Sequence, residues 1–201
     1  MEGAAPSSIL GRIPETVRYH ALLHLVVLIW GFTGVLGRLI TLESATLVFY
    51  RVLIAVPIIA VYLAVRGAPF RIGARPTLGF LAIGLIVAAH WTLFFEAIKL
   101  STVSVGLVCM STAPFVSAVV EPIVFRRRLR MGELSLGFIA AAGMALIFGF
   151  ETQYASGIAV GLLSAALGAC FMVINGRLVV RYDVRAMSLY ELAGGLIGLF
   201  G

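Results

Sequence analysis

Charged side chains are scarce in this sequence, and their scarcity excludes most soluble folds. Asp, Glu, Lys and Arg together make up 12% of the 201 residues, and the mean hydropathy is +1.09. Soluble domains carry about 25% charged residues. A chain of this composition could not hide its apolar surface from water, so we expect it to fold in a lipid bilayer.

Motifs of catalysis and of metal binding are also missing. The two cysteines, Cys109 and Cys170, lie inside apolar runs without metal-ligand spacing, which is typical of small buried hydrophobic residues. The sequence has no HExxH or CxxC motif, no Ser/His/Asp constellation and no phosphate-binding loop. A membrane enzyme built on His90 and Glu96 is weakly supported, because their spacing on one helix turns them about 120° apart. We therefore expect no catalytic residue, no metal and no cofactor.

Long hydrophobic runs dominate what is present. Spanning helices need about 20 mostly apolar residues, and the runs of that kind are roughly 21–40, 46–65, 77–98, 101–125, 133–150 and 156–176, with a seventh beginning near 186. Runs of this length are helices, because an isolated strand cannot satisfy its backbone in lipid. The first 20 residues lack the apolar core of a signal peptide, so the first run is expected to stay in the protein. The sequence predicts an all-α multi-pass membrane protein with six complete transmembrane helices and the start of a seventh.

The positive charges alternate between the gaps that separate these runs. Of the fifteen Lys and Arg residues, twelve lie before the first run or after the second, fourth and sixth. Cytoplasmic loops carry such an excess, so we expect a cytoplasmic N-terminus, and we expect the protein to lie in the cell (inner) membrane. The same arginine clusters would attract anionic lipid head groups. The net charge of +6 is explained in this way, and we expect no nucleic-acid partner.

A short pattern near two helix junctions recurs along the chain. Gly37-Arg38-Leu39 returns as Gly176-Arg177-Leu178, and Tyr50-Arg51 returns as Tyr190-Glu191. The period of about 139 residues covers five helices. Five is an odd number, so the second copy must enter the membrane with the opposite orientation, which is typical of the inverted repeats of secondary transporters.

The repeat divides the chain into three segments. We expect a cytoplasmic tail at 1–19, a first five-helix repeat at 20–151 and an incomplete second repeat at 152–201. The chain stops inside an apolar run, which predicts a truncated product that lacks the remainder of the second copy. An oligomer of identical chains is one way in which the missing helices could be supplied.

Several segments resemble the EamA-type transporters of the drug/metabolite transporter superfamily. The residues that carry the resemblance are Trp30-Gly31 in the first run, Phe49-Tyr50-Arg51 in the second, and the stretch 90–122. The resemblance implies ten helices in two inverted five-helix repeats around a central cavity. It also implies export or exchange of small metabolites, amino acids or drugs. Where many members have a Gly-Glu-Arg-Leu-like turn, this chain has Arg126-Arg127-Arg128-Leu129.

Polar or kinked positions near the middle of the runs are candidates for the wall of a substrate cavity. They are Trp30, Thr33, His90, Ser111 and Pro114. Trp and His at mid-depth are unusual, since aromatic residues normally anchor at the interfaces and intramembrane ionisable groups are costly. Pro114 lacks an N–H and frees the carbonyl of the residue four positions earlier. The alternative for each is ordinary helix packing.

Three charged residues are candidates for gates or ion pairs. Arg51 and Glu96 lie at similar depth near the outer face and could pair with each other. Arg51 could instead snorkel to head groups, and Glu96 could pair locally with Lys99. Glu121, near the cytoplasmic end of its run, could carry a proton or could pair with the cluster at 126–130.

We conclude from the sequence that the chain is a secondary transporter working by alternating access on a small-molecule solute. The alternative is a truncated or non-transporting structural membrane protein.

Overall fold

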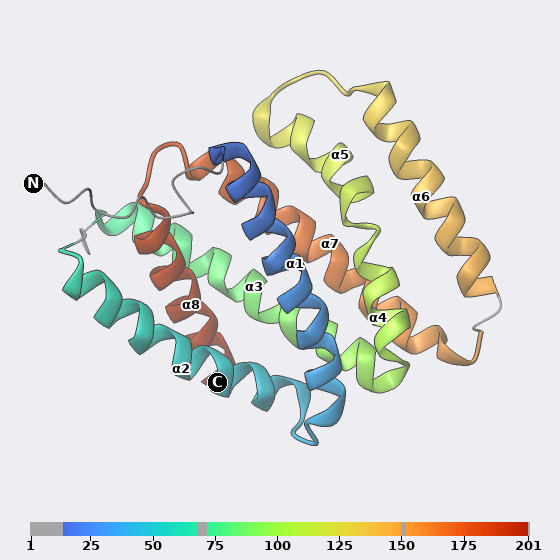
Figure 1. Cartoon of the computed structure of the whole chain (residues 1–201), viewed down its shortest axis with the longest axis horizontal. Helices are drawn as coiled ribbons and strands as arrows, with labels where there is room; N and C mark the ends of the chain where they lie inside the picture. Colours follow the sequence, from blue (N-terminus) through green and yellow to red (C-terminus); the bar gives the residue numbers. More distant parts are fainter. Residues whose placement is uncertain (1–13, 68–71, 150–151, 201) are drawn as a thin grey trace, which may run out of the picture.

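The computed structural model describes residues 14–67, 72–149 and 152–200, and 87% of these residues are helical. No strand occurs within these ranges. The elements, in chain order, are α1 (Glu15–Leu39), α2 (Ser44–Val65), α3 (Ala74–Leu100), α4 (Val103–Met110), α5 (Ala113–Phe125), α6 (Met131–Gly149), the 3-10 turn η2 (Thr152–Tyr154), α7 (Ala155–Leu178) and α8 (Val184–Phe200). The predicted all-α class is confirmed (Figure 1).

Five helical segments of the described residues are long and apolar enough to cross a membrane. They are Glu15–Leu39, Ser44–Val65, Ala74–Leu100, Val103–Phe125 and Thr152–Leu178. The helices predicted at 133–150 and from 186 are present as α6 and α8. The apolar part of α6, Met131–Met144, is shorter than a span, and α8 has 17 residues.

The first helix begins earlier than the apolar run predicts. α1 starts at Glu15, directly after Pro14, so residues 15–19 of the predicted tail are helical. Proline fixes its own φ near the helical value and needs no backbone donor at the start of a helix. Hydropathy alone cannot locate this boundary, because the first turns are polar. The rest of the predicted tail, 1–13, lies outside the described residues.

The predicted helix at 101–125 is not continuous. α4 ends at Met110 and α5 begins at Ala113, just before Pro114. The backbone N–H of Ser111 donates to Val108 O and that of Thr112 donates to Cys109 O, both at 3.1 Å. These tighter turns replace the α-helical bonds around the proline, which has no N–H to donate.

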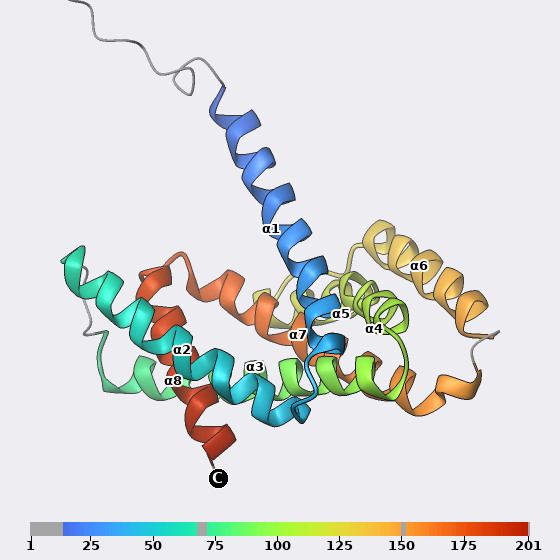
Figure 2. The same cartoon turned by 60° about the horizontal axis from the view of Figure 1, so that its bottom comes forward.

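α3 is the central element, with α7 and α8 packed along it and α2 on the other side of α8 (Figures 1 and 2). Two of the apolar clusters join α3 to α8 and to α2. Phe80, Ile83 and Val87 of α3 pack with Met187 of α8, and Phe95 of α3 packs with three residues of α2, which are Leu47, Val48 and Val52.

Small residues set the distance at which the outer helices approach this centre. α1 meets α3 and α4 through Gly34 and Gly37, and a Cβ on Gly34 would lie 3.4 Å from Val103. Gly137 of α6 lies against Phe115 of α5, where an added Cβ would come within 2.9 Å of the backbone. Most of the remaining surface of α1 and α6 is apolar and exposed, as expected for helices in contact with lipid.

Candidate functional site

His90 lies buried where α3 crosses α7, and it bonds to Ser164 in two ways. Its side chain is 8% exposed, and Ser164 is fully buried. His90 Nδ1 lies 2.7 Å from Ser164 O, and Ser164 Oγ donates to His90 O at 2.8 Å. A carbonyl oxygen can only accept, so Nδ1 carries the ring proton in this arrangement. In the neutral ring Nε2 is then the unprotonated nitrogen, able to accept a hydrogen bond or a proton.

The ring of His90 is held in place by two further residues of α7. A Cβ on Gly168 would lie 2.8 Å from Cε1 and 3.0 Å from Nδ1, so only glycine lets the imidazole occupy this space. The ring of Phe171 lies 5.7 Å away, centroid to centroid. The imidazole is therefore fixed by packing and by hydrogen bonds at once.

The interruption between α4 and α5 lies beside this pair. Ser164 Oγ is 4.0 Å from Met110 Sδ, at the last residue of α4. Cys109 is buried and its Sγ lies 3.7 Å from Ile158 O of α7. We call the meeting point of His90, Ser164 and Met110 the α3–α4–α7 junction. It combines a fixed imidazole, a hydroxyl and a break in a spanning helix.

The other four cavity candidates lie outside this junction or form hydrogen bonds within their own helices. Trp30 is 62% exposed on α1, and Thr33 donates its hydroxyl to Ile29 O at 3.1 Å. Ser111 donates to Val108 O at 2.7 Å and lies 3.3 Å from Met144 Sδ of α6. Pro114 is exposed in the first turn of α5. Of the five candidates, the structure brings His90 into the junction.

Among the described residues, Arg51 and Glu96 contact different partners. The guanidinium of Arg51 lies over the rings of Trp91 and Phe95, at 5.5 Å and 5.0 Å from their centroids. Such cation–π contacts stabilise a cation that is partly removed from water. Glu96 accepts a 2.6 Å hydrogen bond from Ser44 Oγ at the start of α2. The predicted Arg51–Glu96 pair is replaced by these two contacts.

Lys99, the only lysine in the sequence, and Arg38, the arginine of the first repeat, both form hydrogen bonds near the C-terminal end of α3. Lys99 Nζ donates to Leu42 O, so it does not form the local pair with Glu96. Arg38 donates to Ile98 O at 3.2 Å and to Lys99 O at 3.1 Å. The last carbonyls of a helix carry partial negative charge, and the Arg38 guanidinium lies where that charge is concentrated.

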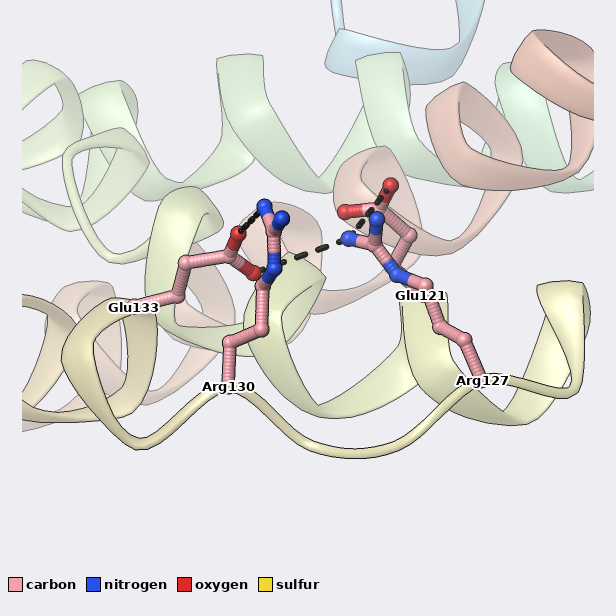
Figure 3. A network of polar contacts seen from close by, with 4 residues as sticks. All are labelled: Glu121, Arg127, Arg130 and Glu133. Atoms are coloured by element: carbon pink, nitrogen blue, oxygen red, sulfur yellow. Dashed lines mark hydrogen bonds and ion pairs between the residues drawn. The ribbon is translucent and has the colours of Figure 1, made fainter.

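Glu121 belongs to an ion-pair network that ties α5 to α6 (Figure 3). Arg127 lies 2.8 Å from Glu121 and 3.6 Å from Glu133, and Arg130 lies 3.0 Å from Glu133. The chain reverses at Arg126, whose φ of 54° is left-handed. The predicted pairing of Glu121 with the arginine cluster is the arrangement found here. Half-exposed pairs of this kind contribute about 0–1 kcal/mol each.

Three polar residues with buried side-chain atoms take part in these contacts but are not among the site candidates from the sequence. They are Ser164 and Asn175 of α7 and Glu191 of α8. Asn175 Nδ2 donates to Glu191 Oε2 at 3.1 Å. Their signal was available, because a polar side chain inside an apolar run always needs a partner. In the sequence, Glu191 serves only to align the two repeats.

A shallow hollow of about 420 Å³ lies between α3 and the end of α8. Its lining is apolar apart from Thr92, and includes Ala88, Gly198 and Leu199. The buried hydroxyl of Thr92 has no hydrogen-bond partner among the described residues. Within the same ranges, no three His, Cys, Asp or Glu side chains are placed to hold a metal ion.

The apolar spans and the buried polar groups between them define a multi-pass integral membrane protein. A model of the EamA-like transporter family matches residues 18–149, about two thirds of the chain. The chain belongs to this family, within the drug/metabolite transporter superfamily, and is a membrane transporter of that type. The family is generally non-enzymatic. Searches of curated proteins and of solved structures found no match.

Proposed function

We propose that the chain is a secondary transporter that exports or exchanges small metabolites, amino acids or drugs by alternating access. In this proposal residues 20–151 form a first five-helix repeat and residues 152–201 begin a second, inverted one. The N-terminus is cytoplasmic and the membrane is the plasma membrane, or the inner membrane of a two-membrane cell. The substrate passes the α3–α4–α7 junction.

The observation that carries the proposal is the interruption of the fourth span beside His90. Discontinuous helices expose backbone groups at mid-membrane, and such irregular backbone is tolerated only where it is buried in protein or lines a cavity. Here Met110, the last residue of α4, reaches Ser164, which in turn holds His90. A solute with hydrogen-bonding groups would meet His90 Nε2 and the loosened backbone of the break together.

The two repeat arginines support the inverted arrangement. Arg38, in the last turn of α1, donates to the carbonyls that end α3. Arg177, in the last turn of α7, donates to Val124 O, near the end of α5. Each arginine thus binds at the C-terminal end of a neighbouring helix. That helix runs in the same direction as the helix that carries the arginine. Helices α1 and α7 therefore make equivalent contacts, as expected for corresponding helices of two repeats.

The proposal is tested by flux of radiolabelled amino acids and cationic drugs into proteoliposomes containing the full chain. For any solute carried, we expect His90→Ala and Ser164→Ala to lower the initial rate about fivefold or more, since each loses hydrogen bonds worth about 1 kcal/mol. Ser135→Ala is the matched control, because Ser135 is exposed on α6 and bonds to Gly132 O of its own helix. Unchanged flux in both junction variants would contradict the site assignment.

A further inference from the structure

Glu191 is a buried carboxylate that is half satisfied. It lies on α8 with 7% of its surface exposed, and Oε2 accepts the 3.1 Å hydrogen bond from Asn175 Nδ2 of α7. The other oxygen, Oε1, and the side-chain oxygen of Asn175 are both buried and have no hydrogen-bond partner within the described part of the chain. Two acceptors on neighbouring helices thus lack a donor.

The surroundings of this pair are apolar. Met187, one turn earlier on α8, packs with Phe80, Ile83 and Val87 of α3. On the other side, Glu191 meets α3 so closely that a Cβ on Gly84 would lie 2.8 Å from its carbonyl carbon. Water has little access to such a place, and an unneutralised carboxylate there carries a large desolvation cost.

No basic side chain of the described residues forms an ion pair with Glu191, and the charged groups on the helices around α8 have other partners, except Arg75, which is exposed near the start of α3. On α2, Arg51 lies over two aromatic rings and Arg66, just after it, lies over Tyr62. On α3, His90 bonds to Ser164, Glu96 to Ser44 and Lys99 to Leu42 O. On α7, Arg177 donates to Val124 O, and on α8 itself Arg185 pairs with Asp183.

We propose that Glu191 and Asn175 form a proton-binding site between α7 and α8. A proton added to Oε1 neutralises the carboxylate and turns the orphan acceptor into a donor, while Oε2 keeps its bond from Asn175. A proton suits the site because it needs no further ligands, whereas a metal cation needs several oxygens and the described residues supply only these two side chains.

Because the pair bridges two helices, its occupancy would bias their packing. Loading and release of one proton per cycle would then couple solute movement to the proton gradient. This coupling rests on the proposed function, whereas proton binding by Glu191 does not. The two are therefore measured separately.

Proton binding is measured by infrared spectroscopy of the full chain in lipid during a pH titration. We expect the spectrum to contain the carbonyl stretch of a neutral, water-shielded carboxylic acid that appears as the pH is lowered. Glu191→Gln should remove this band, and Glu15→Gln, at the exposed start of α1, should leave it intact. Absence of the band from the wild-type spectrum, or its survival in Glu191→Gln, overturns the proposal. So does a Glu191 carboxylate band that responds to sodium and not to pH.

A second variant guards against misfolding of Glu191→Gln. Asn175→Leu removes the donor to Oε2, whose hydrogen bond is stronger to the charged carboxylate than to the neutral acid. The acid band should then persist to a pH higher by about one unit. An unmoved titration in a folded Asn175→Leu protein contradicts the site.

Flux separates this proposal from the proposed function. Proton-driven uptake should be lost in Glu191→Gln while exchange of solute without a gradient continues. Wild-type flux that is indifferent to the proton gradient refutes the coupling and leaves the transporter proposal standing.

Discussion

The crossing of α3 and α8 depends on glycines whose replacement should be measurable. A Cβ on Gly84 would lie 2.8 Å from both Glu191 C and Gly195 N, and closer still to Glu191 O. Carbon atoms pack best at about 3.5–4.0 Å. Gly84→Ala must therefore move the α8 backbone away by roughly 0.7 Å or more. Backbone atoms cannot rotate out of the way as a flexible side chain can.

The size of the effect follows from two opposed contributions. Overpacking of a tight core costs about 1–3 kcal/mol, and the close backbone contact places Gly84→Ala at the upper end of that range. Alanine in a helix gains up to about 1 kcal/mol over glycine. Gly79→Ala on the same helix isolates this gain, because a Cβ there meets nothing within 4 Å. Because both variants share this gain, they should differ by the overpacking cost alone, about 2–3 kcal/mol, with Gly84→Ala the less stable.

Reversible unfolding in mild detergent, followed by tryptophan fluorescence, measures this difference. Trp91, which packs between the two apolar clusters, reports on the α3 environment. Equal midpoints for Gly84→Ala and Gly79→Ala would show that α8 does not approach α3 as closely as described. The same result would remove the close contact that helps to bury Glu191.

Two further predictions concern the loops. Arg127→Ala should lower the free energy of unfolding by about 1 kcal/mol or less, and this loss should be smaller at high salt. Arg128→Ala, at an exposed position, should change it little. Unfolding midpoints at two salt concentrations measure both effects. The side-chain hydrogen bond from Arg185 lowers the pKa of Asp183, the only aspartate of the chain, to about 2. Arg185→Gln should raise that pKa toward about 3.9, read from one ¹³C-labelled aspartate signal. The stabilisation it provides is present above the unfolded value and lost as the pH falls through the folded one.

Much of the helical framework could be predicted from the sequence because the bilayer imposes length and apolarity on each span. The runs at 46–65 and 77–98 correspond closely to α2 and α3. Helix boundaries that do not depend on hydropathy could not be predicted as well. The polar first turns of α1 carry no hydropathy signal, and the interruption before Pro114 depends on how the backbone bonds redistribute around one missing N–H.

Pairings across helices could not be predicted, since they depend on which faces meet. Glu96 and Arg51 lie at similar depth, yet Ser44 reaches the first and the rings of Trp91 and Phe95 cover the second. The pairing of Glu121 could be predicted more easily, because its partner Arg127 follows in the loop directly after α5. The position of His90 near the middle of its run marks it as a site candidate. Its partner, Ser164, lies far along the chain and could not be predicted.

α7 links the two buried polar sites in a way that bears on the proposed mechanism. Ser164, Gly168, Phe171 and Asn175 follow one another at spacings of three or four, so they form one stripe along an unbroken helix. The first three contact His90 and the last contacts Glu191. At 1.5 Å per residue, the ends of the stripe are about 16 Å apart. A rotation of α7 that loosens Ser164 from His90 must also displace Asn175 from Glu191, so one rigid element would join solute passage to proton release.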